Sequence, residues 1–128
     1  MISDLDYFVE DRRIYLPTHF TIDELECPCG CGLGVQTKLV VGLEMLRLLT
    51  GEPLFMTSGA RCPAYNKKVG GVPGSQHPLG LAGDGRFNSP VHKHAILHHA
   101  PALGFNGIGV AETWGHFDMR EKKARWTY

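Results

Sequence analysis

Apolar residues recur at helical spacing between Thr37 and Leu49. The positions that follow this pattern are Leu39, Val40, Leu43, Leu46 and Leu48. Steps of three and four residues place side chains on one face of an α-helix. The turn-forming segment Gly51-Glu52-Pro53 then ends the run. The pattern predicts an amphipathic helix whose apolar face packs on the core.

Two shorter signals flank this helix. Thr21 followed by Glu24 has the spacing of a capping box, which predicts a short helix that the CPCGCG loop ends. The apolar run from Leu54 to Thr57 predicts a short buried strand. Because the chain leaves this strand through Ser58-Gly59-Ala60-Arg61, we expect Arg61 at a strand exit.

A second helix is predicted from Pro90 to Leu103, and it carries four histidines. Two of them, His94 and His98, are four residues apart, so a helix would place them on one face, where they could bind a metal ion. Histidines on a moderately polar helix more often form a solvated face, and we favour that interpretation.

The segment from Trp114 to Arg120 alternates between apolar and polar residues. As a strand it would direct Phe117 and Met119 toward the core. The opposite face would carry the polar residues of the segment, which are His116, Asp118 and Arg120. Gly104 to Val110 has the pattern of a turn and a strand that would pair with it in antiparallel fashion. Together these elements predict an α+β fold, a small antiparallel sheet flanked by helices.

Composition and charge narrow the class of protein. The chain has 128 residues, of which 43% are hydrophobic and 20% charged, as in a compact globular domain. We expect one domain over residues 1–128, because two hydrophobic cores in a chain of this length would each be too small to be stable. We also expect a monomer. Lys plus Arg equals Asp plus Glu at 13 each, so charge gives no reason to expect a nucleic-acid or anionic-membrane partner.

No apolar run approaches the roughly 20 residues of a membrane span. The N-terminal segment MISDLDYFVEDRR is acidic where a secretory signal has a basic start and an apolar run. We therefore expect synthesis in the cytoplasm without a signal peptide.

Three of the four cysteines form the run Cys27-Pro28-Cys29-Gly30-Cys31, and the fourth is Cys62. Such a set could hold a structural zinc ion, although the one-residue gaps are tighter than the usual spacing of paired ligands. We favour reduced thiols or a disulfide that involves Cys62. A zinc-dependent interaction domain centred on this run is a further alternative.

Three residues have the chemistry of a catalytic zinc site, in which His and carboxylate ligands leave a fourth position to water. His77 and Asp84 are separated by six residues. Gly80 and Gly83 between them allow the backbone to bring both side chains to one ion. His116, on a strand whose other face is apolar, is the third candidate ligand.

The surroundings of these residues resemble the D-alanyl-D-alanine carboxypeptidase type of zinc peptidase, in the peptidase M15 family. The matching motifs are a Ser-Gly-x-Arg strand exit at residues 58–61, an SxHxxGxAxD segment at residues 75–84, and a late histidine followed by Trp126. The resemblance covers about residues 20–126.

This resemblance implies a zinc ion on His77, Asp84 and His116, and a fold like that of hedgehog and D-Ala-D-Ala peptidase domains. It also implies a metallopeptidase, either a carboxypeptidase or a murein endopeptidase, that hydrolyses stem or cross-link peptides of peptidoglycan. Phage endolysins and bacterial wall-remodelling enzymes share the pattern. We therefore expect action on the cell wall. The protein could be phage-released or virion-associated, and an origin in a bacterium stays open.

The sequence departs from the family pattern before the last histidine. Many relatives have a glutamate three residues before it or a histidine two before it, where this chain has Thr113 and Trp114. Two carboxylates remain as candidates for the general base. Glu112 would reach a zinc-bound water only if the chain before His116 curls over. Asp118 shares the predicted face of His116, and could act as the base or orient that ligand.

Three further residues are candidates for substrate binding. Arg61 could bind a substrate carboxylate or carbonyl, a task that suits its planar guanidinium, or form a structural ion pair. Ser75 and Gln76 could hydrogen-bond the substrate backbone, or Ser75 could cap the turn before His77. A second class of function stays open, a catalytically silent zinc-containing binding module of the same fold.

Overall fold

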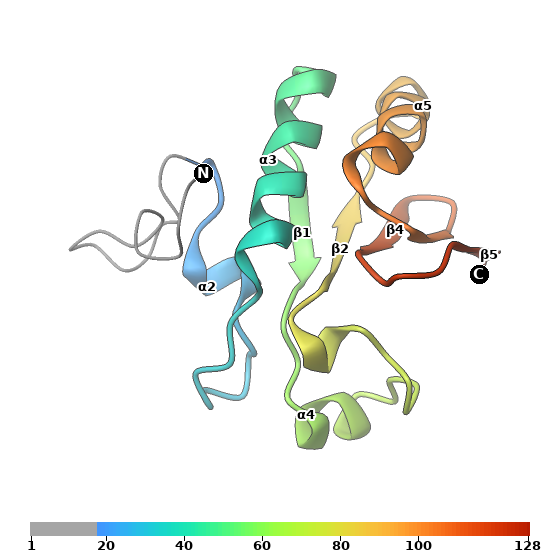
Figure 1. Ribbon diagram of the computed structural model, residues 1–128. Helices are drawn as coiled ribbons and strands as arrows, with labels where there is room; N and C mark the ends of the chain where they lie inside the picture. Colours follow the sequence, from blue (N-terminus) through green and yellow to red (C-terminus); the bar gives the residue numbers. More distant parts are fainter. Residues whose placement is uncertain (1–17) are drawn as a thin grey trace.

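The computed structural model describes residues 18–128 (Figure 1). The segment MISDLDYFVEDRR, on which the expectation about a signal peptide depends, lies outside the described residues. Within residues 18–128, no helix combines the length and the apolar character that crossing a membrane requires.

A five-stranded sheet with the order β1-β2-β4-β3-β5 forms the centre of the fold. The strands are β1 (Phe55–Ser58), β2 (Ala82–Arg86), β3 (Gly107–Val110), β4 (Trp114–Asp118) and β5 (Ala124–Thr127). Every neighbouring pair is antiparallel except β3 and β5, which run parallel. The predicted α+β class is confirmed, but the sheet is mixed. Residues 119–123 return the chain directly from β4, and β5 is added beyond β3 instead of beside β4.

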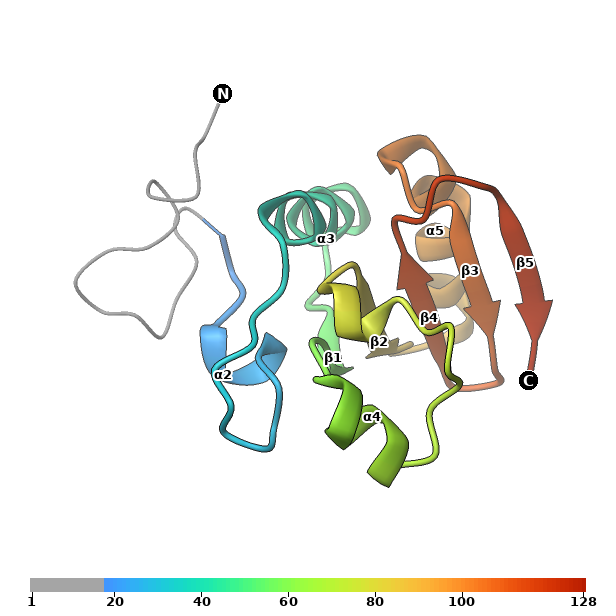
Figure 2. The same cartoon turned by 60° about the horizontal axis from the view of Figure 1, so that its bottom comes forward.

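Two longer helices, α3 (Thr37–Thr50) and α5 (Pro90–His99), contact each other and cover one face of the sheet (Figure 2). The core between these layers contains Leu39, Val40, Leu43 and Leu46 of α3, Ile96 of α5, and Phe105, Ile108 and Phe117. The predicted amphipathic helix is therefore confirmed, and Gly51 ends it in a left-handed conformation with φ of 70°. Leu48 is the exception in the predicted apolar set, because it is 57% exposed.

Two predicted elements differ in detail from the structure. The helix expected to reach Leu103 ends at His99, and Ala100–Leu103 forms a 3-10 turn, η2. Pro101 explains the change, because it has no backbone N–H with which to continue α-helical hydrogen bonding. The strand expected to be buried is β1 at the edge of the sheet, where Phe55 is 49% exposed.

The alternation of β4 directs its two faces to different layers. Phe117 is buried in the core and Met119 packs against it. His116 and Asp118 lie on the opposite face of the sheet, away from α3 and α5. One face of β4 thus stabilises the fold while the other carries polar groups.

The short helix α2 (Ile22–Leu25) begins with the predicted capping box. The Thr21 hydroxyl accepts a hydrogen bond from the backbone N–H of Glu24, and the Glu24 carboxylate accepts one from the backbone N–H of Thr21. Leu25 is fully buried, and its carbonyl accepts a hydrogen bond of 2.7 Å from the backbone N–H of Ala60. The cap therefore supports the segment that follows β1.

Replacing Thr21 by alanine is expected to lower the free energy of unfolding by about 1 kcal/mol, because the backbone N–H of Glu24 loses its acceptor. Urea denaturation followed by circular dichroism measures the change. The control is Thr113→Ala, at an exposed threonine outside any helix. Equal unfolding midpoints for the two variants would show that the cap contributes nothing.

Candidate metal centre

Three side chains from separate elements converge on the polar face of the sheet. His77 begins the 3-10 turn η1 (His77–Leu79), while Asp84 and His116 are the central residues of β2 and β4. Asp84 and His116 are direct partners in the antiparallel register of these strands. One ligand atom from each of the three residues lies within 4.8 Å of the others. The structure thus brings together the three residues that the sequence motif singled out.

The orientation of His77 is fixed by the backbone. Its Nδ1 lies 2.6 Å from the carbonyl oxygen of Gly59, which can only accept a hydrogen bond. Nδ1 therefore donates to this carbonyl, and Nε2 is directed at Asp84, 3.4 Å from its Oδ2. A carbonyl on the second ring nitrogen is the usual support for a metal-binding histidine.

His116 is held from both sides by carboxylates. Its Nε2 lies 2.7 Å from Asp118 Oδ2, and its Nδ1 lies 2.9 Å from Asp84 Oδ1. Asp118 is fully buried and receives two further side-chain hydrogen bonds from Arg120, of 2.8 and 2.7 Å. Asp118 therefore orients the His116 ring, and Nδ1 of that ring faces the point where the three side chains meet.

The carboxylates of the site are ionised. Burial raises the pKa of Asp84, but hydrogen bonds from His116 and His77 outweigh this effect and hold that pKa below its usual range. Burial likewise raises the pKa of Asp118, and the hydrogen bonds from Arg120 and His116 again lower it overall. Ionised carboxylates are the form that binds metal ions.

A divalent metal ion fits this donor set. Two imidazole nitrogens and a carboxylate oxygen are ligand types that zinc takes, and three protein ligands leave one of four positions to water. The three candidate ligand residues are at most 8% exposed, so the protein shields the site on most sides. His77 Nε2, His116 Nδ1 and an oxygen of Asp84 would hold the ion.

Two glycines of β3 allow the surrounding groups to approach. A side chain at Gly107 would begin 2.1 Å from the Asp118 carboxylate, and one at Gly109 would begin 2.3 Å from the indole nitrogen of Trp126. Without side chains at these positions, Asp118 and Trp126 lie directly against the strand. Sequence reasoning missed these glycines and the Gly59 carbonyl. The alternating Gly-Ile-Gly of β3 was a signal for close approach.

The candidate metal centre opens into a cavity of about 710 Å³. Residues 69–72 and 74–77 line one part of it, and Trp114, Trp126 and Tyr128 line another. Arg61 and Arg120 add two guanidinium groups. Among the described residues that line this cavity, Asp84 is the only one whose side chain is a carboxylate. The cavity is thus cationic and aromatic around the candidate ion site.

The predicted substrate-binding residues all line this cavity. The Arg61 guanidinium forms an ion pair of 3.0 Å with Asp84 Oδ2 and donates to Ser58 Oγ at 3.0 Å. Ser75 Oγ accepts a hydrogen bond of 3.1 Å from the backbone N–H of His77, as in the capping alternative. Gln76 precedes η1 at the cavity wall.

The remaining candidates lie elsewhere. Glu112 is exposed in the turn between β3 and β4, outside the residues that line the cavity, and its carbonyl accepts a hydrogen bond from Lys93 Nζ. His94 and His98 are exposed on α5, with stacked rings 6.5 Å apart, on the opposite side of the sheet from the centre. His92 of the same helix is fully buried, so it does not belong to the predicted solvated face.

Comparison with known protein families identifies the family of the chain. A family model described as Peptidase M15 matches residues 18–118, a range that contains all three candidate ligands. A search of curated proteins gives no match to the chain.

Proposed function

Because this chain belongs to the peptidase M15 family, as its motifs indicated, we propose that it is a zinc peptidase that hydrolyses peptides of the bacterial cell wall. The observation that carries the proposal is the convergence of His77, Asp84 and His116 within 4.8 Å at a cavity. For hydrolysis, such a centre requires a peptide bound in the cavity and a water molecule bound to the metal.

Zinc on three protein ligands would lower the pKa of its bound water to about 7 and polarise the scissile carbonyl. The protein's own residues prepare this chemistry. The Gly59 carbonyl holds His77 in the tautomer whose Nε2 can bind metal. Asp118 holds His116 from the other side, and Trp126, with its ring 5.3 Å from His116, limits access of bulk water.

Arg61 is proposed to bind a carboxylate or carbonyl of the substrate. A guanidinium has five N–H donors, and Arg61 uses its Nε and one donor on each terminal nitrogen for Ser58, Asn66 and Asp84. The remaining donors are available to a ligand in the cavity. Stem peptides of peptidoglycan end in a carboxylate, which this planar group can bind.

Arg61→Lys is expected to raise KM roughly 10-fold for peptides with a free C-terminal carboxylate, because lysine keeps the charge but not the planar pair of donors. Amidated versions of the same peptides are the matched substrates, and their KM should change little. Steady-state kinetics on both sets measures the difference. Equal effects on both sets would assign Arg61 to structural support of Asp84.

The two candidate bases are proposed to have different roles. Both oxygens of Asp118 are engaged by Arg120 and His116, which suits a residue that positions the histidine. Glu112 is the remaining candidate for the base, and it would act only after the exposed turn between β3 and β4 folds toward the cavity.

The function is tested on defined wall peptides. Purified protein should release fragments identifiable by mass spectrometry, a chelator should stop the reaction, and added zinc should restore it. The fragments also reveal whether the enzyme is a carboxypeptidase or an endopeptidase. Action from a phage-released or virion-associated form stays a prediction, tested by treating intact sacculi from outside.

A catalytically silent binding module is the second candidate. It is favoured because, among the described residues that line the cavity, no side chain other than that of Asp84 is a carboxylate. A silent module would bind sacculi and release no new amino groups over long incubation. Chelator-sensitive release of amino groups would exclude it.

A further inference from the structure

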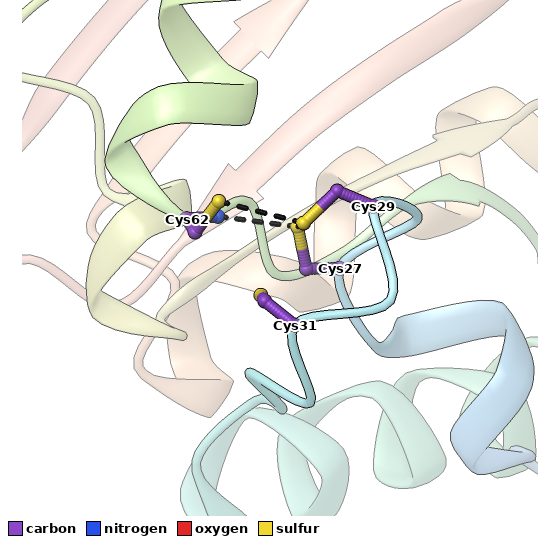
Figure 3. Close-up of side chains that lie close together, drawn as sticks. All are labelled: Cys27, Cys29, Cys31 and Cys62. Atoms are coloured by element: carbon purple, nitrogen blue, oxygen red, sulfur yellow. Dashed lines mark hydrogen bonds between the residues drawn. The ribbon is translucent and has the colours of Figure 1, made fainter.

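The four cysteines of the chain gather at one place, although Cys62 is more than 30 residues from the run that contains the other three. Figure 3 shows Cys27, Cys29 and Cys31, on the loop after α2, together with Cys62 at the start of α4 (Pro63–Lys68). All four are free thiols, and their sulfur atoms lie within 4.8 Å of one another. None of the four contributes to the centre formed by His77, Asp84 and His116.

The sulfur spacing matches tetrahedral coordination. The Sγ atoms of Cys27 and Cys29 are 3.4 Å apart, and those of Cys29 and Cys62 are 3.6 Å apart. In a tetrahedral site with zinc–sulfur bonds of about 2.3 Å, neighbouring sulfurs are about 3.8 Å apart. A covalent disulfide bond is much shorter, about 2.0 Å. The cluster therefore has room for an ion at its centre.

The loop is shaped to present its three thiols together. Gly30 and Gly32 have φ of 83° and 86°, a left-handed conformation that curls the chain between and after the cysteines. The backbone N–H of Gly30 donates to the Cys27 carbonyl, and that of Cys27 to the Leu33 carbonyl. This curling overcomes the tight one-residue gaps, because the thiols no longer have to reach one ion from an extended chain.

Backbone N–H groups also point at the sulfur atoms. The N–H of Cys62 donates to Cys27 Sγ at 3.3 Å, and that of Tyr65 donates to Cys62 Sγ at 3.4 Å. Such bonds stabilise negative charge on sulfur, and the thiolate is the form that binds metal. Four thiolates form the closed ligand set of structural zinc sites.

The loop also needs a source of stability. Residues 28–32 are all exposed, so this segment buries little apolar surface, and it contains no regular secondary structure. We propose that Cys27, Cys29, Cys31 and Cys62 bind a structural zinc ion, separate from the centre at His77. This ion ties the loop after α2 to the start of α4.

The location of this ion links it to the cavity. Cys62 directly follows Arg61, whose backbone N–H donates to the His77 carbonyl and whose guanidinium contacts Asp84. The same segment provides the Gly59 carbonyl that orients His77. A metal on Cys62 would therefore fix the end of the segment that supports the first centre.

The test is metal content per chain, which does not depend on activity. Protein prepared under reducing conditions with zinc should contain two zinc ions per chain by elemental analysis. The double variant Cys29→Ser/Cys31→Ser and the variant His77→Ala should each contain one. His98→Ala, which changes an exposed histidine of α5, is the matched control and should retain two.

Cobalt(II) identifies which of the two ions is lost in each variant. Cobalt-loaded wild-type protein should show thiolate-to-cobalt charge-transfer absorption, which His77→Ala keeps and Cys29→Ser/Cys31→Ser loses. Wild-type protein with one zinc per chain and no such absorption would overturn the proposal, as would a disulfide at Cys62 found by mass mapping of native protein. Loss of the His77 ion alone would count only against the proposed peptidase.

Discussion

His77→Ala is expected to lower the rate of peptide hydrolysis by roughly three orders of magnitude or more, which corresponds to about 4 kcal/mol of transition-state stabilisation. The variant removes Nε2, one of three candidate ligand atoms, while Asp84 and His116 keep their mutual hydrogen bond. Without a tightly held metal, the water at the site loses its activation. His77 lies in η1, outside the sheet, so the fold should persist.

Single-turnover and steady-state assays on wall peptides measure the loss, and circular dichroism checks the fold. His98→Ala is again the control, because it removes an exposed imidazole from α5. A His77→Ala protein that hydrolyses peptides at the wild-type rate would contradict the assignment of this residue to the metal.

Asp118→Asn is expected to weaken zinc binding by about 10- to 100-fold, the usual effect of removing the group that supports a ligand histidine. The amide has the same shape, but it lacks the negative charge that His116 and Arg120 both contact. Its NH2 group also has to face one of these donors. Because Asp118 is fully buried, no water can replace the lost acceptor without a change in packing.

Competition with a chelator of known affinity measures zinc binding in this variant. Glu112→Gln is the matched control, because it makes the same chemical change at an exposed carboxylate and should leave zinc affinity unaltered. An Asp118→Asn protein that keeps its zinc affinity but loses turnover would mean that Asp118 acts as the base. Loss of turnover in Glu112→Gln, with zinc retained, would support Glu112 in that role.

Local patterns were sufficient for much of the fold. The periodicity of residues 37–49 predicted α3, and the alternation after Trp114 predicted which side chains of β4 face the core. The capping box at Thr21 was also visible, because both of its hydrogen bonds join residues three positions apart. Each of these features depends on neighbours along the chain, which the sequence displays directly.

Several differences between prediction and structure concern features that contacts between distant segments determine. The sequence did not contain a local signal for β5, whose parallel pairing with β3 depends on where the returning chain finds an open edge. Nor did it separate Leu48 from the buried leucines of α3, because exposure depends on what covers that turn of the helix. Pro101 was a local signal for the end of α5, and the prediction overlooked it.

The sequence by itself determined the candidate ligand types and the motif around His77 and Asp84, because these two residues lie on one short segment with its own glycines. Only the tertiary structure decided that Asp84 lies opposite His116 and that Glu112 stays outside the cavity. It likewise decided that Arg120 donates hydrogen bonds to Asp118. It also decided that Cys62 joins the other cysteines. These relations depend on strand register and packing between segments up to 35 residues apart, which local propensity does not encode.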